Sequence, residues 1–209
     1  MSAIVIVDAG TGNLRSVAKA IEAVGGRAHV TCDPAIIAAA DKVVVPGQGA
    51  FAGFMAELSE TGVKEALGEV IAGGRPYLGI CLGLQILFDQ SEEHGITPGL
   101  GVLAGDVKRF APGAEKVPHI GWNEVSRTAT GRTDPLLGGV PEGACFYFVH
   151  SYYAVPRDPS CVALTATHGV EFCAAVRKDH VFGCQFHPEK SQKSGLALLA
   201  AFVTGGGAR

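Results

Sequence analysis

A cysteine between two glycines has the setting that most favours covalent chemistry in this chain. Cys81 is the central residue of Gly-Ile-Cys-Leu-Gly (79–83) and follows the apolar run 76–80, and Leu84, Leu87 and Phe88 come after it at helical spacing. A strand, a tight turn and a helix in this order form a nucleophile elbow, which projects its central side chain from the end of a sheet. The pattern predicts a nucleophile at Cys81. The alternative is a buried cysteine in an ordinary strand-to-helix turn.

A base with an orienting partner is predicted at the end of another strand. His187 and Glu189 flank Pro188, after the expected strand 181–186. The residue before a proline is biased toward extended backbone, where residues i and i+2 point the same way. Glu189 is then placed to reach one imidazole nitrogen of His187, as a catalytic base requires. A surface His and Glu in a turn is the alternative, but the cysteine elbow at another strand end favours a Cys81–His187–Glu189 triad.

Donors for an oxyanion are expected in the turn after a third strand. Gly47, Gln48 and Gly49 follow the expected strand 42–45, and the glycines leave the backbone N–H groups open to a ligand. Acyl transfer needs such donors where the tetrahedral oxyanion forms. We assign one donor to Leu82 N–H, directly after the nucleophile, and one to the backbone of Gln48 and Gly49. An ordinary strand-to-helix turn remains the alternative.

Two further features resemble ligand sites only in part. The loop Gly-Thr-Gly-Asn (10–13) lies between an expected strand and helix, where a phosphate can bind, but Arg15 stands at the third glycine of the dinucleotide motif. His119 and His150 belong to no H-x-x-x-H or Cys/His pattern of the kind that binds zinc. We therefore expect no cofactor and no metal.

The elements that position these residues change character along the chain. The first half alternates apolar strands with amphipathic helices, which predicts a parallel sheet covered on both faces. From residue 105 to residue 185 strand-like segments dominate, which predicts an antiparallel extension. The expected strands are 3–8, 27–31, 42–45, 76–80, 105–110, 119–125, 145–153, 161–167, 172–177 and 181–186, and the helices 14–24, 50–60, 63–72 and 191–203. The prediction is a single domain, 1–209, with a three-layer, flavodoxin-like α/β fold and an open, twisted, mostly parallel sheet.

The composition of the chain argues against several classes of function. The chain has 209 residues, 47% of them apolar, and a net charge of −3. Its Lys and Arg residues form no run, so a nucleic-acid groove is not expected. No stretch approaches the roughly 18 apolar residues of a membrane span, and no signal-peptide pattern opens the chain. We expect a cytoplasmic protein whose six cysteines are reduced.

Together these motifs resemble the class I, or triad, glutamine amidotransferases. The resemblance is carried by segments 79–85, 186–189 and 46–49, in family order and across most of the chain. Further segments resemble the glutaminase subunits of imidazole glycerol phosphate synthases, namely 8–16, 49–51, 120–123, 147–152 and 187–191. Gln48 stands where small apolar residues are also common in the family. Only its backbone matters chemically, so this difference has little cost.

The resemblance implies glutamine hydrolysis. Cys81 would be the nucleophile, His187 the general base and acid, and Glu189 the group that orients His187. Substrate glutamine would be bound by Gln85, Ser151 and Tyr152, the last two through their backbone.

The resemblance also implies a partner, a (β/α)₈-barrel synthase that forms a heterodimer with this subunit. Ammonia would pass to it to make imidazole glycerol phosphate and aminoimidazole carboxamide ribotide in histidine biosynthesis. Asn13, Trp122 and Lys190 would face this synthase. A core position for Trp122 and a merely solvated charge for Lys190 are the alternatives.

Two rival functions remain open at this point. The first is a glutaminase subunit for anthranilate, pyridoxal phosphate or purine synthesis, which segments 120–123 and 147–152 disfavour. The second is a non-catalytic flavodoxin-like binding module that uses loop 10–13, which the intact triad disfavours.

Overall fold

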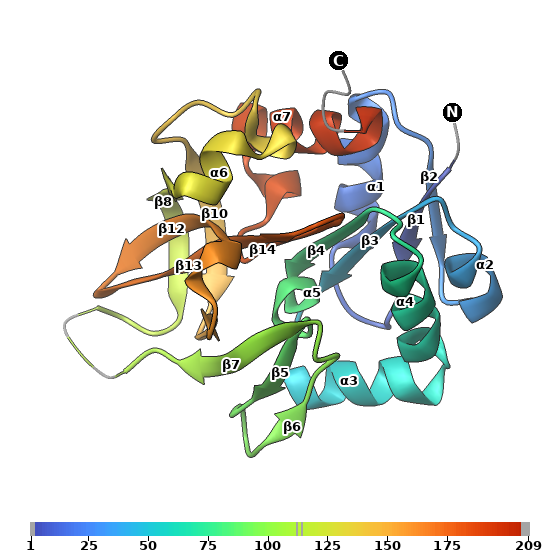
Figure 1. Ribbon diagram of the computed structural model, residues 1–209, viewed down its shortest axis with the longest axis horizontal. Coiled ribbons are helices and arrows are strands. Elements are labelled where there is room, and N and C mark those ends of the chain that lie inside the picture. The colour runs from blue at the N-terminus through green and yellow to red at the C-terminus, as the bar shows by residue number, and fades with distance from the viewer. Residues whose placement is uncertain (1–2, 112, 114, 206–209) are drawn as a thin grey trace.

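Five segments pair as parallel strands in the main sheet of the protein, and four of them are apolar. The computed structural model describes residues 3–111, 113 and 115–205 (Figure 1). The parallel strands are β2 (Ala28–Thr31), β1 (Ile4–Val7), β3 (Lys42–Gly47), β4 (Tyr77–Cys81) and β14 (Val181–Cys184), in that order across the sheet. The sheet continues antiparallel through β13 (Val170–Lys178), β12 (Val162–His168) and β9 (Ser126–Arg127). The predicted mostly parallel sheet with an antiparallel extension is therefore confirmed.

Helices cover both faces of this sheet, which explains why its inner strands are apolar throughout. Helices α1 (Leu14–Ala23) and α7 (Gln192–Thr204) lie on one face, and α2 (Pro34–Ala38), α3 (Phe51–Glu60) and α4 (Val63–Ala72) on the other (Figure 1). Successive strand residues point to opposite faces. Ile4 and Ile6 accordingly pack into the cluster with α1 and α7, while Val5 and Val7 pack into the cluster with α3 and α4.

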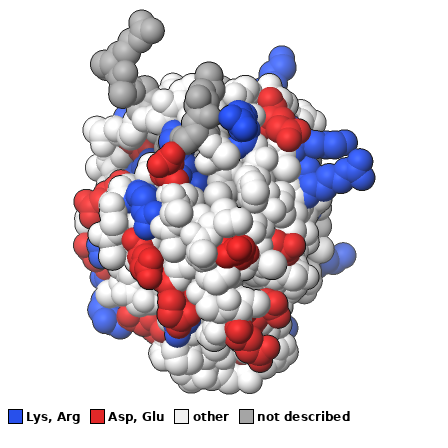
Figure 2. Space-filling model, turned by 90° about the vertical axis from the view of Figure 1, so that its right-hand side faces the viewer, with Lys and Arg blue, Asp and Glu red and all other residues white. Residues whose placement is uncertain are grey.

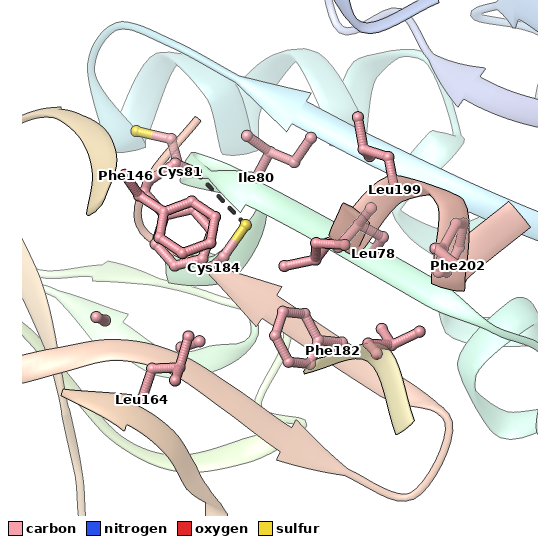
Figure 3. Close-up of a cluster of buried hydrophobic side chains, with 14 of the residues drawn as sticks. Leu78, Ile80, Cys81, Phe146, Leu164, Phe182, Cys184, Leu199 and Phe202 are labelled. Atoms are coloured by element: carbon pink, nitrogen blue, oxygen red, sulfur yellow. Dashed lines mark hydrogen bonds between the residues drawn. The ribbon is translucent and has the colours of Figure 1, made fainter. Parts of the chain in front are cut away.

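The first of these clusters reaches the predicted nucleophile. Leu78 and Ile80 on β4 pack there with Phe182 on β14 and with Leu199 on α7. Figure 3 shows Cys81 at the edge of this cluster, with its sulfur directed away from the apolar side chains. The core thus holds the β4 backbone and leaves the thiol at its boundary.

Two smaller sheets form the wall beside the carboxyl ends of the parallel strands. One has the order β11 (Tyr152–Pro156), β7 (Leu103–Arg109), β5 (Phe88–Ser91) and β6 (Thr97–Pro98). The other pairs β10 (Cys145–His150) with β8 (His119–Glu124). The sequence pattern predicted one strand over 145–153, which is wrong, because the chain breaks at Ser151 and its two halves pair in different sheets.

Other departures from the sequence pattern are local. The helix expected after Cys81 is only α5 (Leu82–Gln85), since Phe88 already begins β5, which pairs with β7. Helix α2 was not predicted, although Asp33 caps it by accepting the Ala35 N–H at 2.8 Å. Short elements also not predicted are α6 (Ala129–Thr133) and the 3₁₀ turns η1 (Pro135–Leu137), η2 (Pro159–Cys161) and η3 (Pro188–Lys190).

On the face in Figure 2, basic and acidic residues are interspersed among neutral ones. Within the described residues, no helix has the length and apolar character that crossing a membrane requires.

Candidate active site

The turn at Cys81 is strained at the cysteine itself. Cys81 has φ 56° and ψ −105°, a region that non-glycine residues rarely adopt. The flanking glycines Gly79 and Gly83 do not have positive φ. They are needed for space, because a Cβ on Gly83 would lie 1.8 Å from the Val45 carbonyl oxygen and one on Gly79 would lie 2.2 Å from that of Gly83. The helix, β3 and β4 can pack this closely only with glycine at both positions.

His187 and Glu189 form a buried pair. His187 Nδ1 lies 2.9 Å from Glu189 Oε1, and their side chains are 2% and 1% exposed. The His187 backbone is extended, as predicted, but the chain then turns into η3, so the pairing arises from a 3₁₀ turn and not from a continuous strand. Because Glu189 accepts from Nδ1–H, the neutral ring keeps Nε2 free to take a proton.

The surroundings of His187 favour its protonated form. Burial alone lowers the pKa of His187, but the neighbouring Cys81 and Glu189 outweigh it and raise that pKa to about 9. In the described part of the chain, the buried Nε2 atom has no hydrogen-bond partner. The imidazole is therefore oriented by Glu189 at one nitrogen and available to Cys81 at the other.

Ser191 holds the loop that carries this pair. Its hydroxyl donates to the His187 carbonyl oxygen at 2.6 Å and accepts the Tyr147 N–H at 3.0 Å. The His187 N–H also donates to the Tyr147 carbonyl oxygen at 2.9 Å. Strand β10 thus fixes the loop. Sequence reasoning singled out no role for Ser191, and its place in segment 187–191 was the only signal.

The predicted oxyanion donors lie beside the nucleophile. Gln48, Gly49 and Leu82 line the same cavity of about 430 Å³ as Cys81. Gly49 has φ 99°, which glycine adopts without strain. Gly47 does not line the cavity and instead serves close packing, since a Cβ there would lie 2.7 Å from Leu82 Cβ.

The predicted substrate residues form another part of the cavity wall. Gln85, Ser151 and Tyr152 all line it. Gln85 Nε2 donates to the Tyr152 carbonyl oxygen at 3.1 Å, so its own position is fixed by the strand that follows Ser151.

Sequence reasoning missed a carboxylate in the same wall. Glu93 lines the cavity, and its Oε2 accepts the Phe51 N–H at 2.6 Å, where α3 begins. It lies in a turn after β5, and no sequence motif distinguished it. Only the tertiary fold brings it to the site.

Of the predicted interface residues, Lys190 lines the cavity, and Trp122 lies beside Tyr147, which also lines it. Trp122 is 49% exposed, so the core alternative for it is wrong. Its ring lies 6.2 Å from that of Tyr147, and Lys190 Nζ lies 5.7 Å from the Tyr147 ring centre. Asn13 does not line the cavity. Its loop instead abuts the oxyanion turn, since a Cβ on Gly12 would lie 3.6 Å from the Pro46 carbonyl oxygen.

The two histidines considered as metal ligands are bonded to each other. His119 Nδ1 lies 2.9 Å from His150 Nε2. Burial lowers the pKa of His119 to about 4 and that of His150 to about 3, so both rings are neutral near pH 7. Among residues 3–111, 113 and 115–205, no group of three or more His, Cys, Asp or Glu side chains is arranged to hold a metal ion.

A thiol, an oriented imidazole and backbone donors around one cavity are the parts that acyl transfer requires. Known proteins match the chain along its length. The model of the family described as glutamine amidotransferase class-I matches residues 5–204. Relatives named imidazole glycerol phosphate synthase subunit HisH include those of Syntrophotalea carbinolica, 51% identical over 95% of this chain and 98% of the relative, and of Geobacter sulfurreducens, 49% identical over 97% and 98%.

Solved structures share the fold at low sequence identity. PurLQS from Thermotoga maritima matches with a TM-score of 0.74 at 18% identity, over 98% of this chain and 99% of that chain. The glutaminase domain of Trypanosoma brucei CTPS, solved with bound acivicin, matches with a TM-score of 0.67 at 15% identity, over 100% and 96%. The fold is common to all of these, and the family match with relatives about half identical along almost the whole chain places this protein among the class I glutamine amidotransferases.

Proposed function

We propose that the chain hydrolyses L-glutamine to glutamate and ammonia and is the glutaminase subunit of an imidazole glycerol phosphate synthase. The observation that carries the proposal is the buried His187–Glu189 pair at 2.9 Å beside the cavity that Cys81 lines. The subunit name of the relatives, about half identical over nearly full length, supports the pathway.

The reaction follows from the positions of these groups. His187 Nε2 takes the thiol proton, and the Cys81 sulfur attacks the side-chain carbonyl carbon of glutamine. The oxyanion is stabilised by the Leu82 N–H and by a backbone N–H of Gln48 or Gly49. His187 returns the proton to the departing nitrogen, which leaves as ammonia and gives a glutamyl thioester. Water, deprotonated by His187, then adds to the thioester, and glutamate leaves as the thiol is restored.

The cavity wall suits the ends of the amino acid. Glu93 is the carboxylate of the wall and attracts the α-ammonium group of glutamine. Ser151 and Tyr152 supply backbone groups, as the family resemblance implies. Gln85 uses its Nε2 within the protein, which leaves its amide oxygen to accept from substrate.

The partner docks at the mouth of this cavity. Ile120 and Trp122 are 60% and 49% exposed on one face of β8. Trp122 pairs with Tyr147 of β10, and Lys190 lies over the Tyr147 ring. Exposed aromatic and aliphatic side chains rimmed by charge are typical of protein interfaces. We assign this face to a (β/α)₈-barrel synthase subunit, which receives the ammonia and uses it in histidine biosynthesis.

An activity assay tests the proposal. The purified chain is combined with a barrel synthase and its ribotide substrate, and glutamate and imidazole glycerol phosphate are measured together. Equal amounts of the two products are expected when glutamine is the only nitrogen source. A complex that makes imidazole glycerol phosphate from free ammonia but hydrolyses no glutamine would overturn the proposal, as would glutamate formation only with an anthranilate, pyridoxal phosphate or purine synthase.

A further inference from the structure

A buried carboxamide that the reaction above does not use points at the nucleophile. Gln185 follows the last residue of β14 and is 0% exposed. Its Nε2 lies 3.5 Å from Cys81 Sγ, within the range of hydrogen bonds to sulfur. Burying an amide costs stability unless its polar atoms find partners, and the partner of this amide nitrogen is the Cys81 sulfur. A donor held against the reacting sulfur therefore calls for an explanation.

We propose that Gln185 is a further catalytic residue, whose side-chain N–H holds and stabilises the Cys81 sulfur in its thiolate form. The proposal deepens the proposed function and rests on it, since it takes Cys81 as the nucleophile. Three steps carry it: the orientation of the amide, the rigidity of the network that fixes this orientation, and the difference between thiolate and thioester.

The orientation of the Gln185 amide is fixed by a backbone carbonyl. The oxygen and nitrogen of an amide are assigned from their partners. The Tyr152 carbonyl oxygen can only accept, so the Gln85 atom 3.1 Å from it must be the NH₂ group. The same Gln85 nitrogen lies 3.0 Å from the Gln185 amide, whose facing atom must then be the oxygen. The remaining Gln185 atom, which faces Cys81, is the NH₂ donor.

A second set of bonds holds the Tyr152 carbonyl in place. His150 Nδ1–H donates to it at 2.9 Å, so His150 Nε2 accepts from His119 Nδ1–H at 2.9 Å. His119 Nε2 then accepts from Asn123 Nδ2 at 3.2 Å, and Asn123 also donates to the Thr167 carbonyl oxygen at 2.8 Å. The order of donors holds only while both rings are neutral, which the low pKa values of His119 and His150 ensure near pH 7. The Tyr152 carbonyl oxygen thus accepts from His150 on one side and from Gln85 on the other, and this fixed acceptor sets the orientation of Gln85 and, through it, of Gln185.

A fixed N–H donor stabilises the charged sulfur of the thiolate more than the neutral sulfur of the thiol or the thioester. A hydrogen bond to a charged acceptor is roughly twice as strong as one to a neutral acceptor. The Gln185 N–H therefore stabilises the thiolate more than the thiol or the thioester. It favours loss of the Cys81 proton to His187 before attack, and it stabilises the thiolate again when the carbon–sulfur bond breaks in the second half-reaction.

Alkylation of the thiols in the full chain tests this role without using glutamine. Iodoacetamide reacts with thiolate, and mass spectrometry of the peptides gives the rate at each cysteine as a function of pH. In Gln185→Met, which keeps the size of the side chain but has no N–H, alkylation of Cys81 at pH 7 is expected to slow about tenfold. The pH at which the alkylation rate of Cys81 is half its maximum should rise by about one unit in this variant. Gln185→Glu, which also lacks the donor and adds charge, should slow it at least as much.

Controls exist within the same chain. Cys32 and Cys145 are exposed and should react alike in every variant. Gln90→Met makes the same substitution at a glutamine bonded to Asp106 on another sheet and should leave the Cys81 profile unchanged. Other titratable groups around Cys81 are common to all variants, so the difference between profiles reports Gln185. These groups are His187, Glu189, Cys184, His150, Glu93 and Lys190.

Two results would overturn the proposal. One is a folded Gln185→Met or Gln185→Glu variant, with the melting temperature of wild type, whose Cys81 profile equals that of wild type. The other comes from the unmodified chain and needs no variant to fold: a Gln185 side-chain NH₂ resonance that does not shift with the pH midpoint of Cys81 alkylation. Neither measurement involves glutaminase activity, so an inactive chain with the expected profiles would defeat the proposed function and leave this inference standing.

Discussion

Gly47 on β3 lies opposite Cys81 on β4 in the parallel register of the sheet. The two neighbouring strands therefore end at the same level of the sheet edge. The nucleophile lies at the end of β4, and the oxyanion turn follows β3. The contact is close enough that a Cβ on Gly47 would lie 2.7 Å from Leu82 Cβ. The spacing between nucleophile and donors is thus set by strand pairing, the most rigid part of the fold.

Replacement of the nucleophile should abolish hydrolysis while other cysteines remain replaceable. Cys81→Ala is expected to lower kcat by roughly 10⁴–10⁶, the usual effect of losing a triad nucleophile. A glutamine-like electrophile should label one thiol per chain, located by peptide mass spectrometry. Cys32→Ala is the control, because Cys32 is exposed and is not among the residues that line the cavity. Labelling chiefly at Cys173 or Cys184 would contradict the assignment.

The two other triad members should differ in the severity of their loss. His187 moves protons in both half-reactions, whereas Glu189 orients the ring and compensates its charge. His187→Ala should therefore be almost inactive, and Glu189→Gln, which keeps the shape of the side chain, should retain more glutaminase activity. Free ammonia supplied to the complete complex should restore the synthase reaction in both. The opposite ranking in steady-state kcat would reverse the roles.

The His187–Glu189 pair should also make stability depend on pH. Because Cys81 and Glu189 together raise the folded pKa of His187 to about 9, while an unfolded histidine titrates near 6.5, the folded chain holds this proton more tightly. The stabilisation is complete below about pH 6.5 and is lost as pH rises to about 9, with an upper limit of roughly 3 kcal/mol. The stability difference between wild type and Glu189→Gln, from urea unfolding, should therefore be larger at pH 6 than at pH 9.

The pKa shifts of two other histidines, His119 and His150, change the stability of the protein with pH in the opposite direction, but they do not affect this comparison. Burial lowers the pKa of His119 to about 4 and that of His150 to about 3, so their contribution is present above pH 6.5 and lost at lower pH. It is common to both proteins and cancels in the difference. A difference that grows toward pH 9 would show that Glu189 does not raise the pKa of His187.

The sheet order near the site was predictable because its strands have a simple pattern. Strands β1, β3, β4 and β14 are short apolar runs, and the structure places them within about two residues of the predicted bounds. Their burial on both faces makes the run continuous, which is the clearest strand signal in a sequence. The positions of Cys81 at the end of β4 and of His187 shortly after β14 followed from this pattern.

What the sequence did not reveal depends on contacts between distant segments. Leu84, Leu87 and Phe88 have helical spacing, yet Phe88 joins β5 because β7 offers a strand partner, and periodicity carries no information about that partner. Gln185 lies in an apolar strand end and meets Cys81 across 104 positions of sequence. The sequence around Gln185 gives no sign of this contact, because only the tertiary fold brings its side chain to Cys81.

The exposed indole should be a main contact for the synthase partner. Trp122→Ala is expected to weaken binding of the barrel synthase by about 2 kcal/mol or more, since exposed Trp residues at interface centres are frequent hot spots. Calorimetric titration measures the affinity. Ile96→Ala is the matched control, because Ile96 is 67% exposed and is not among the residues that line the cavity. Equal effects of the two substitutions on affinity would remove Trp122 from the docking face.

The oxyanion turn should couple glutamine hydrolysis to the partner. Glutamine hydrolysed while no synthase is bound to use the ammonia is wasted, so we expect low activity for the chain alone. If a backbone N–H of the turn points away from the oxyanion at rest, the missing donor costs about 10²–10³ in rate. Binding of the partner and its ligand would shift the population toward the competent geometry. Turnover should then rise by about two orders of magnitude in the liganded complex, mainly in kcat.

Gly49 is the residue at which this coupling is best tested. It has φ 99°, and a Cβ there would meet nothing within 4 Å, so a substitution acts through the backbone and not through a clash. An added Cβ disfavours positive φ by roughly 1–2 kcal/mol. Gly49→Ala should therefore reduce the stimulation by the partner severalfold while affinity for the partner changes little. Gly53→Ala is the control, since Gly53 lies in α3 with equally open space and without positive φ, and it should keep full stimulation. Full glutaminase turnover from the chain alone, or equal stimulation of both variants, would place the regulation outside this turn.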